Sequence, residues 1–246
     1  MRKFSIKAIV LLSLLVAVPA FAETVLTPAA GAVPSSTSLY DYRTTYELQE
    51  EFATGFTTST TIGTHGWLTT GGTTTHLAPE VGEPGIIRRD TSSTINTTTS
   101  LQLYSATRQF LGSENYSWLW RVRLNTNDAN TTIQIGVFTA ATITPVHGVY
   151  LQKLDADSNW HCVTRNSSTS VPVDSGVPST TEWVKLEATK TAAGVQFLID
   201  GVNVCGLMTT NVPTGSMLPV AMIVNSSAES KTFDAGYYQH RIKVSR

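Results

Sequence analysis

The sequence predicts an all-β protein in which two antiparallel sheets pack face to face as a sandwich. Many segments of about 6–9 residues alternate apolar and polar side chains with a period of two, and Gly, Pro, Asn and Asp separate them. No window shows a 3.6-residue apolar period bounded by helix caps. About a dozen such segments in one domain need two sheets to bury their apolar faces.

The first 22 residues are predicted to be an export signal. Arg2, Lys3 and Lys7 precede or flank a short apolar run, and an Ala-Phe-Ala sequence ends it at residue 22. The run is shorter than the ~20 residues that span a bilayer. No cysteine follows it for lipid attachment. We therefore expect a protein without a membrane span after cleavage, exported to the periplasm or the extracellular space.

Two regions follow the export signal. Residues 23–40 are rich in Ala, Pro, Ser and Thr without an apolar period, which is typical of a linker. Residues 41–246 are expected to form one domain, since all-β domains often reach ~200–250 residues. Within 57–75 about half of the residues are Thr; we expect a loop and an edge strand there, with Trp67 packed on the sandwich.

The charge balance excludes two classes of partner. The whole chain has 17 basic and 18 acidic residues, and the export signal holds three basic and no acidic ones, so the mature chain has 14 against 18 and a net charge of −4. No block of five or more basic residues occurs. Nucleic acid and anionic membrane surfaces need such a basic patch, so neither is expected as a partner.

Three consecutive segments, 116–126, 131–138 and 148–155, have well-defined faces. Their apolar sides hold aromatic and β-branched residues, including Trp118 and Trp120, which we expect in the core. Their polar sides carry Arg121, Arg123, Gln134, Tyr150 and Gln152. If the three strands are neighbours, these side chains share one outer face that suits sugar hydroxyls and sugar rings. A solvated outer face without a ligand explains the same pattern.

Later segments continue the alternation to the end of the chain, at 182–190, 194–201, 202–208, 218–225 and 237–245. In the first of these, Trp183 shares its side with Lys185 and Glu187. An indole among charged neighbours is expected to be exposed, so Trp183 is a further candidate platform for a sugar.

Residues 154–166 raise the question of a calcium site, because Asp155, Asp157 and Asn159 stand at alternate positions. A helix-loop-helix calcium loop needs Gly at its sixth position and Glu at its twelfth, which here hold Trp160 and Asn166. Strand-like flanks favour a hairpin whose tip is residues 155–159. We predict the hairpin and no metal ligand set.

Cys162 and Cys205 are the only cysteines, and export favours their pairing in an oxidising compartment. The chain-entropy model assigns about 3–4 kcal/mol to closing such a loop. The alternation of side chains opposes the bond. Cys162 lies on the same side of its strand as Trp160, whereas Cys205 lies on the side opposite to Val202 and Val204, which we expect to face the core. Pairing therefore needs either an outward-facing Trp160 or a bulge at Gly206. Two separate buried thiols are the alternative.

The order of several short sequences resembles a β-sandwich module of bacteriophage virion and tail proteins, which belongs with the concanavalin-like lectin and glucanase jelly rolls. The sequences are EEFATGF, IGTHGW, EPGIIRRDT, NWHCVTRN, VDSGVP, the hairpin around FLIDGVNV, and NVPTG, and the similarity spans roughly residues 46–244. The resemblance implies a concanavalin-like jelly roll with an outer face that binds glycans or packs in an assembly. Virion proteins carry no export signal, which favours a secreted or periplasmic protein with the same module.

Catalytic patterns of this fold are not evident in the sequence. Retaining glucanases need an E-x-D-x-E strand, and here Glu187 stands alone on its strand while Glu80 and Glu83 flank a Gly-Pro loop. A Gly-x-Ser-x-Gly elbow and zinc-ligand spacing of His are also missing. An alginate-type lyase, suggested by TIQIG and GVYLQ, would need a His where Gly136 stands.

We therefore expect a non-enzymatic, cofactor-independent module that binds a glycan or a cell-surface polymer. The alternatives are a structural subunit of a virion-like or tail-like particle and a polysaccharide lyase.

Overall fold

A computed structural model describes residues 45–53, 61–103 and 109–243. The export signal and the linker predicted for residues 1–40 lie outside this range. The described residues belong to one unit, Leu39–Arg246. Within them, no helix is long and apolar enough to cross a membrane.

Seventeen strands make up the described part of the chain. Their bounds are β1 (Thr45–Glu50), β2 (Thr61–Ile62), β3 (Trp67–Thr70), β4 (Thr73–Leu77), β5 (Ile86–Asp90), β6 (Thr98–Leu103), β7 (Phe110–Leu111), β8 (Asn115–Leu124), β9 (Thr131–Phe138), β10 (Gly148–Lys153), β11 (Asn159–Asn166), β12 (Thr169–Pro178), β13 (Trp183–Thr191), β14 (Gly194–Ile199), β15 (Val202–Met208), β16 (Ser216–Asn225) and β17 (Thr232–Lys243).

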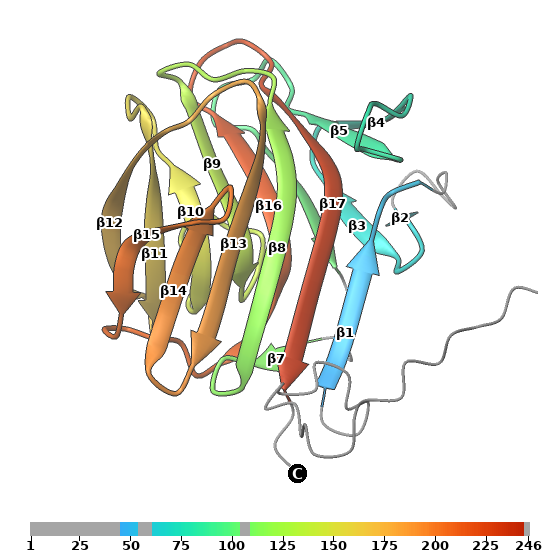
Figure 1. Ribbon diagram of the computed structural model, residues 1–246. Helices are drawn as coiled ribbons and strands as arrows, with labels where there is room; N and C mark the ends of the chain where they lie inside the picture. The colour runs from blue at the N-terminus through green and yellow to red at the C-terminus, as the bar shows by residue number, and fades with distance from the viewer. Residues whose placement is uncertain (1–44, 54–60, 104–108, 244–246) are drawn as a thin grey trace, which may run out of the picture. The chain divides into compact units, whose positions relative to one another are not determined.

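The strands form two antiparallel sheets, as predicted. Sheet A has eight strands in the order β15-β14-β13-β8-β17-β5-β4, with β1 also paired to β17. Sheet B has nine, in the order β12-β11-β10-β9-β16-β6-β3-β2, with β7 also paired to β16. Figure 1 shows β8, β13, β14 and β17 of sheet A in front of β9, β10 and β16 of sheet B.

The core between the sheets consists of the apolar side of each alternating strand. In β8 every second residue is buried, from Tyr116 to Leu124, and Trp118 and Trp120 are 2% and 0% exposed. Trp67 from the threonine-rich region packs edge-on against Trp120, with ring centroids 5.2 Å apart. The predicted positions of these three tryptophans are confirmed.

The threonine-rich region crosses from sheet B to sheet A through Gly71 and Gly72, which have φ values of +64° and +55°. A Cβ at either glycine would collide with a backbone carbonyl, of Thr98 or Asp90. Arg89 secures the crossing: its buried guanidinium donates to carbonyl oxygens of the turn, including Thr70 O at 3.1 Å. Burial lowers the pKa of Arg89 to about 10.

Cys162 and Cys205 form a disulfide, with Cα atoms 6.4 Å apart. Trp160 is 1% exposed in the core, so it does not face outward. Instead, β15 contains the predicted irregularity: its pairing with β14 shifts between Val204 and Leu207, and the intervening Cys205 and Gly206 have φ values of +63° and +65°. This bulge turns Cys205 toward sheet B, and the disulfide joins the two sheets.

The hairpin predicted at residues 154–166 is confirmed. β10 and β11 pair antiparallel around the turn, and Ala156 in the turn has a φ of +63°. Asp155 accepts a hydrogen bond from Thr132 Oγ1 at 2.9 Å, and Asp157 lies 3.7 Å from the His161 imidazole. The aspartates therefore serve the turn and its neighbours.

Candidate functional site

The five polar residues expected on one outer face are divided between two faces. Arg121 and Arg123 lie on β8 in sheet A, whereas Gln134, Tyr150 and Gln152 lie on β9 and β10 in sheet B. The orientation predicted for each side chain is right, but the assumption that β8 neighbours β9 is wrong. The chain crosses the sandwich between β8 and β9, so one ligand cannot lie across all five residues.

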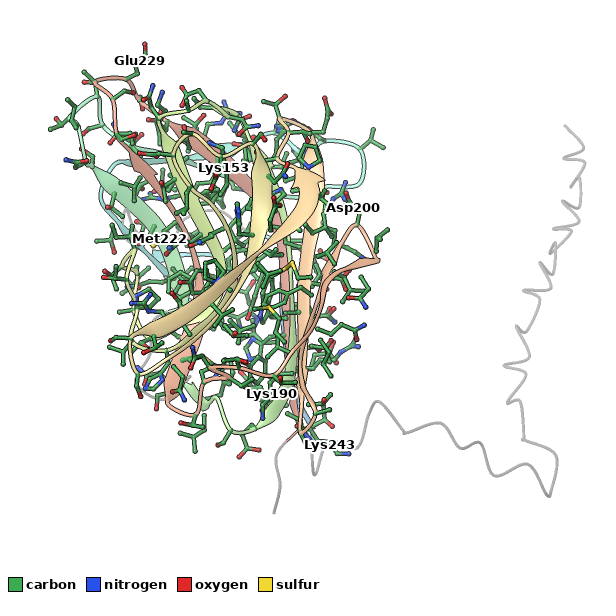
Figure 2. The ribbon with its side chains drawn as sticks, turned by 90° about the vertical axis from the view of Figure 1, so that its left-hand side faces the viewer. Lys153, Lys190, Asp200, Met222, Glu229 and Lys243 are labelled. Atoms are coloured by element: carbon green, nitrogen blue, oxygen red, sulfur yellow. A yellow bond between two sulfur atoms is a disulfide. The ribbon has the colours of Figure 1, made fainter. Side chains whose placement is uncertain are left out.

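The outer face of sheet B is closed around Tyr150. A second apolar cluster lies on this face and consists of Phe138, Tyr150, Val163, Leu218, Val220 and Met222. Residues 139–147 extend over this cluster: Ala141 packs on it, and Gln134 Nε2 donates to Ile143 O at 3.0 Å. Figure 2 labels Met222 on this side of the molecule and Asp200 on the opposite side.

Three of the predicted ligand-binding residues are therefore buried. Gln134, Tyr150 and Gln152 are 2%, 2% and 7% exposed, and the two glutamine side chains lie within hydrogen-bonding distance at 3.3 Å. They contribute to the packing of residues 139–147 on sheet B rather than to an open surface.

The outer face of sheet A differs, because an indole ring lies on it partly exposed. Trp183 on β13 pairs in register with Arg123 on β8. The Arg123 guanidinium carbon lies 4.7 Å from the centre of the Trp183 ring, and that of Arg121 lies 5.9 Å away. The ring extends across β8 to β17, where its Cη2 would lie 3.2 Å from a Cβ at Gly236. The ring is therefore held nearly fixed over three strands.

A tight turn stands beside the indole and is fastened to the sheet. Glu80 and Glu83 exchange two backbone hydrogen bonds of 3.0 Å, and Gly82 supplies the positive φ of +84° that the turn requires. Between them Val81 is fully exposed. Glu80 accepts two bonds from Arg123, at 2.9 and 3.0 Å, so the turn is tied to β8.

Two further contacts of the turn fix its position over the sheet. Arg121 forms an ion pair with the buried Glu83, and Trp183 Nε1 donates to Glu80 at 3.1 Å. Glu83 Oε2 sits above Gly236, where a Cβ would collide with it, at an irregularity in the pairing of β17 with β8. The missing side chain at Gly236 thus makes room for both the turn and the indole.

Asp234 completes the ion-pair network. It accepts bonds from Arg88 at 2.7 and 3.0 Å and from Arg123 at 2.7 Å. Hydrogen bonds from Arg123 and Trp183 lower the pKa of Glu80. The bond to Asp234 raises the pKa of Arg88, and the bonds to Glu80 raise that of Arg123. Glu80, Arg88 and Arg123 are therefore charged near neutral pH, and their arrangement positions the indole.

The turn, Asp234 and Gly236 were not among the residues expected at a site. The sequence EVGEPG does indicate a loop with two carboxylates, but its contact with Arg121 and Arg123 joins positions about 40 residues apart. Asp234 and Gly236 are more than 100 residues from both arginines, and no local pattern indicates that proximity.

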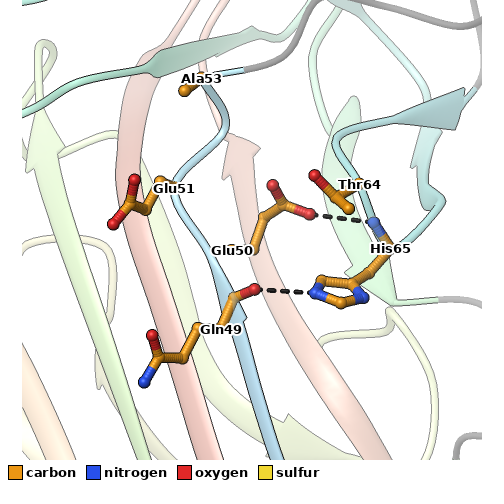
Figure 3. Close-up of a pocket in the computed structure, with 6 residues that line it drawn as sticks. All are labelled: Gln49, Glu50, Glu51, Ala53, Thr64 and His65. Carbon is orange, nitrogen blue, oxygen red and sulfur yellow. Dashed lines mark hydrogen bonds between the residues drawn. The ribbon is translucent and has the colours of Figure 1, made fainter.

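A separate cavity of about 310 Å³ lies between the end of β1 and the turn that precedes β3. Figure 3 shows its lining residues, Gln49, Glu50, Glu51, Ala53, Thr64 and His65. The buried Glu50 carboxylate accepts from the backbone N–H of Phe52 at 3.2 Å and of His65 at 3.1 Å. His65 Nε2 lies 2.8 Å from Gln49 O. These bonds join β1 to the turn, and we assign the cavity no ligand.

Within 45–53, 61–103 and 109–243, no group of three or more His, Cys, Asp or Glu side chains is arranged to hold a metal ion.

Comparison with known proteins defines the fold. No family model matches the sequence, and no curated protein matches it. Solved structures do match: a protein of unknown function from Shewanella oneidensis MR-1, with a TM-score of 0.61, has 13% identity over 82% of this chain and 89% of that one. The carbohydrate recognition domain of Emp47p matches with a TM-score of 0.55 and 14% identity, over 84% of this chain and 100% of that one.

A β-glucanase from Bacillus licheniformis matches with a TM-score of 0.54 and 11% identity, over 81% of this chain and 98% of that one. These likenesses confirm the expected lectin and glucanase jelly roll as the fold of this chain. At such low identity they establish the fold alone.

Proposed function

We propose that this protein is an exported, non-enzymatic module that binds a glycan or another cell-surface polymer on the outer face of sheet A. The observation that carries the proposal is the position of Trp183. Its partly exposed indole is held across three strands by Glu80, Arg123 and the space above Gly236. A fixed aromatic ring with polar groups at its edge suits a sugar, which has an apolar face and a hydroxyl rim.

Two further features support this assignment. Val81 at the tip of the adjacent turn adds an exposed apolar side chain next to Glu80. A protein with the same fold, Emp47p, has a carbohydrate recognition domain, which is support by analogy.

The lyase and glucanase alternatives have less support. On the outer side of β9, Thr132, Gln134 and Gly136 occupy the alternating positions, and none is a carboxylate or a histidine. Residues 139–147 pack over Gln134, which donates to Ile143 O, and over the apolar cluster that contains Tyr150. A polysaccharide chain would have to displace residues 139–147 to reach them.

A structural role in a particle is the second candidate, and it rests on a different surface. The edge strand β15 carries Val202 and Leu207, which are 65% and 55% exposed. Exposed apolar residues on an edge strand favour contact with another chain. Light scattering after size-exclusion chromatography tests this: self-association removed by Val202→Asp would favour the assembly role.

Binding to a glycan array tests the main proposal. The mature protein is expected to bind a subset of glycans, and Trp183→Ala should lose that binding while it remains folded. Tyr46→Ala is the matched control, because Tyr46 is an aromatic residue of sheet A that is 46% exposed on β1. Equal binding by Trp183→Ala and the unmodified protein would refute the site, and no binding to any glycan would refute the function.

A further inference from the structure

The charged side chains around Trp183 are paired with one another. Four cationic side chains lie there, and each has a carboxylate partner. The pairs are Arg88 with Asp234, Arg121 with Glu83, Arg123 with Glu80, and Lys185 with Glu187. The four pairs cancel, and Asp200, which accepts from the Lys185 backbone N–H at 2.8 Å, adds one negative charge beside them. An anionic ligand would have to compete with a carboxylate already bound to each arginine.

The pairs differ in how far they reach the solvent. The side chains of Glu83 and Asp234 are 1% and 0% exposed, whereas that of Glu80 is 42% exposed. Glu80 is also the carboxylate that contacts the indole edge, through Trp183 Nε1. A sugar stacked on Trp183 would therefore meet a negative charge at that edge. Its hydroxyls can donate to the Glu80 oxygens, whereas a uronate, sulfate or phosphate group is repelled by them.

We infer that the site takes a neutral glycan, without uronate, sulfate or phosphate groups, and that Glu80 provides the selection against anionic polymers. This inference rests on the proposed function. In it, Trp183 contacts the apolar face of a sugar ring, Glu80 accepts from hydroxyl groups, and exclusion of anions comes from a like charge at the indole edge.

Affinity electrophoresis of the mature protein tests the inference, in native gels that contain a neutral β-glucan, galactomannan or polygalacturonate. We expect at least one neutral polymer to retard the protein and polygalacturonate to leave its mobility unchanged. Trp183→Ala should abolish the retardation by the neutral polymer.

Glu80→Gln separates charge from contact. The amide oxygen can still accept from Trp183 Nε1, but Arg123 loses part of its compensating charge. We expect this variant to bind the neutral polymer more weakly, because Glu80 contacts its hydroxyl groups, and to gain affinity for polygalacturonate on the order of tenfold. The matched control is Glu229→Gln, which removes the same charge from a side chain that is 76% exposed and ion-paired with Lys231, away from this network.

The outcomes distinguish the two proposals. If the unmodified protein binds polygalacturonate more tightly than neutral polymers, and Trp183→Ala abolishes this, the inference is overturned while the proposed function stands. An equal gain in Glu80→Gln and Glu229→Gln would also overturn the role of Glu80. If no polymer retards the unmodified protein or Glu80→Gln, the proposed function fails, and the inference fails with it.

Discussion

The guanidinium of Arg123 lies 4.7 Å from the centre of the Trp183 ring, while the same group is bound by Glu80 and Asp234. Two residues that are 60 positions apart in the sequence are direct partners in the pairing of β8 with β13. Arg123 therefore acts as a support for the indole and for the turn beside it. It is not a free cation on an open face.

Gly236→Ala should damage the site without replacing any residue that would contact a ligand. A Cβ there collides with Glu83 Oε2 and lies 3.2 Å from Trp183 Cη2, so the Glu83 carboxylate and the indole must shift. We expect loss of glycan binding and a stability cost of about 1–3 kcal/mol. Chemical denaturation and the glycan array measure the two effects.

Gly176→Ala is the control for this change. Gly176 has a positive φ, of +69°, which Gly236 does not, but a Cβ there meets nothing within 4 Å. Its cost should be backbone strain of about 1 kcal/mol with binding intact. Normal binding by Gly236→Ala would contradict the role of that glycine.

Tyr150→Ala should reduce stability and leave glycan binding unchanged. The ring is 2% exposed and packs on Phe138 with centroids 5.4 Å apart. Removing a buried aromatic ring costs about 3–5 kcal/mol. Thermal unfolding measures the stability; a stable variant that has lost glycan binding would instead place the site on sheet B.

The disulfide should be complete in the mature protein and should stabilise it. Alkylation of the unfolded chain without reductant is expected to label neither Cys162 nor Cys205. The bond closes a loop with a sequence separation of 43 residues. Replacing both cysteines by Ala should therefore lower the unfolding free energy by about 3–4 kcal/mol. Two labelled thiols would contradict the bond.

Because of the buried His240, the protein should become less stable as the pH is lowered. Burial lowers the pKa of His240 to about 3 from 6.5, since the ring lies in the core next to Tyr238 and Phe110. As pH falls below about 6.5, the unfolded chain takes up the proton before the folded protein does. The stabilisation from keeping His240 neutral is therefore complete above about pH 6.5 and decreases toward pH 3. The free energy of unfolding should be about 2 kcal/mol lower at pH 5.

Urea unfolding at pH 5 and pH 8 measures this loss, and His240→Phe is the comparison. The variant loses the 2.9 Å contact with Tyr238 Oη, so it should be less stable at pH 8. Its stability should nevertheless change less between the two pH values. If His240→Phe kept the pH dependence of the unmodified protein, the loss of stability at pH 5 would come from other titratable groups.

Arg89→Lys should destabilise the crossing between the sheets. The guanidinium donates to Thr70 O and Thr73 O, each at 3.1 Å, and to other acceptors of the same turn. An ammonium group cannot reach them all, and each buried carbonyl left without a donor carries a penalty. We expect a loss of about 2–4 kcal/mol in unfolding free energy, against a negligible effect for Lys185→Arg at a partly exposed position.

The sequence alone determined which side of most strands faces the core. A period of two in β8, β9 and β10 follows from the pleat of a strand, so the inward Trp120 and Ile135 and the outward Arg121 and Tyr150 were predictable. Only the tertiary structure decided what covers each outward residue. Sheet membership depends on where connections cross the sandwich, and residues 139–147 bury Tyr150 through contacts that no local pattern encodes.

The same limit applies to the disulfide and to the site. Compartment and cysteine count favoured the pair, but the bulge at Cys205 and Gly206, which depends on pairing with β14, decided that the sulfur atoms meet. The charged neighbours of Trp183 predicted an exposed ring, and the structure shows a partly exposed one. Its partners Glu80, Arg123 and Gly236 come from distant segments, because sheet pairing and ion pairing join residues by position in space and not by order in the chain.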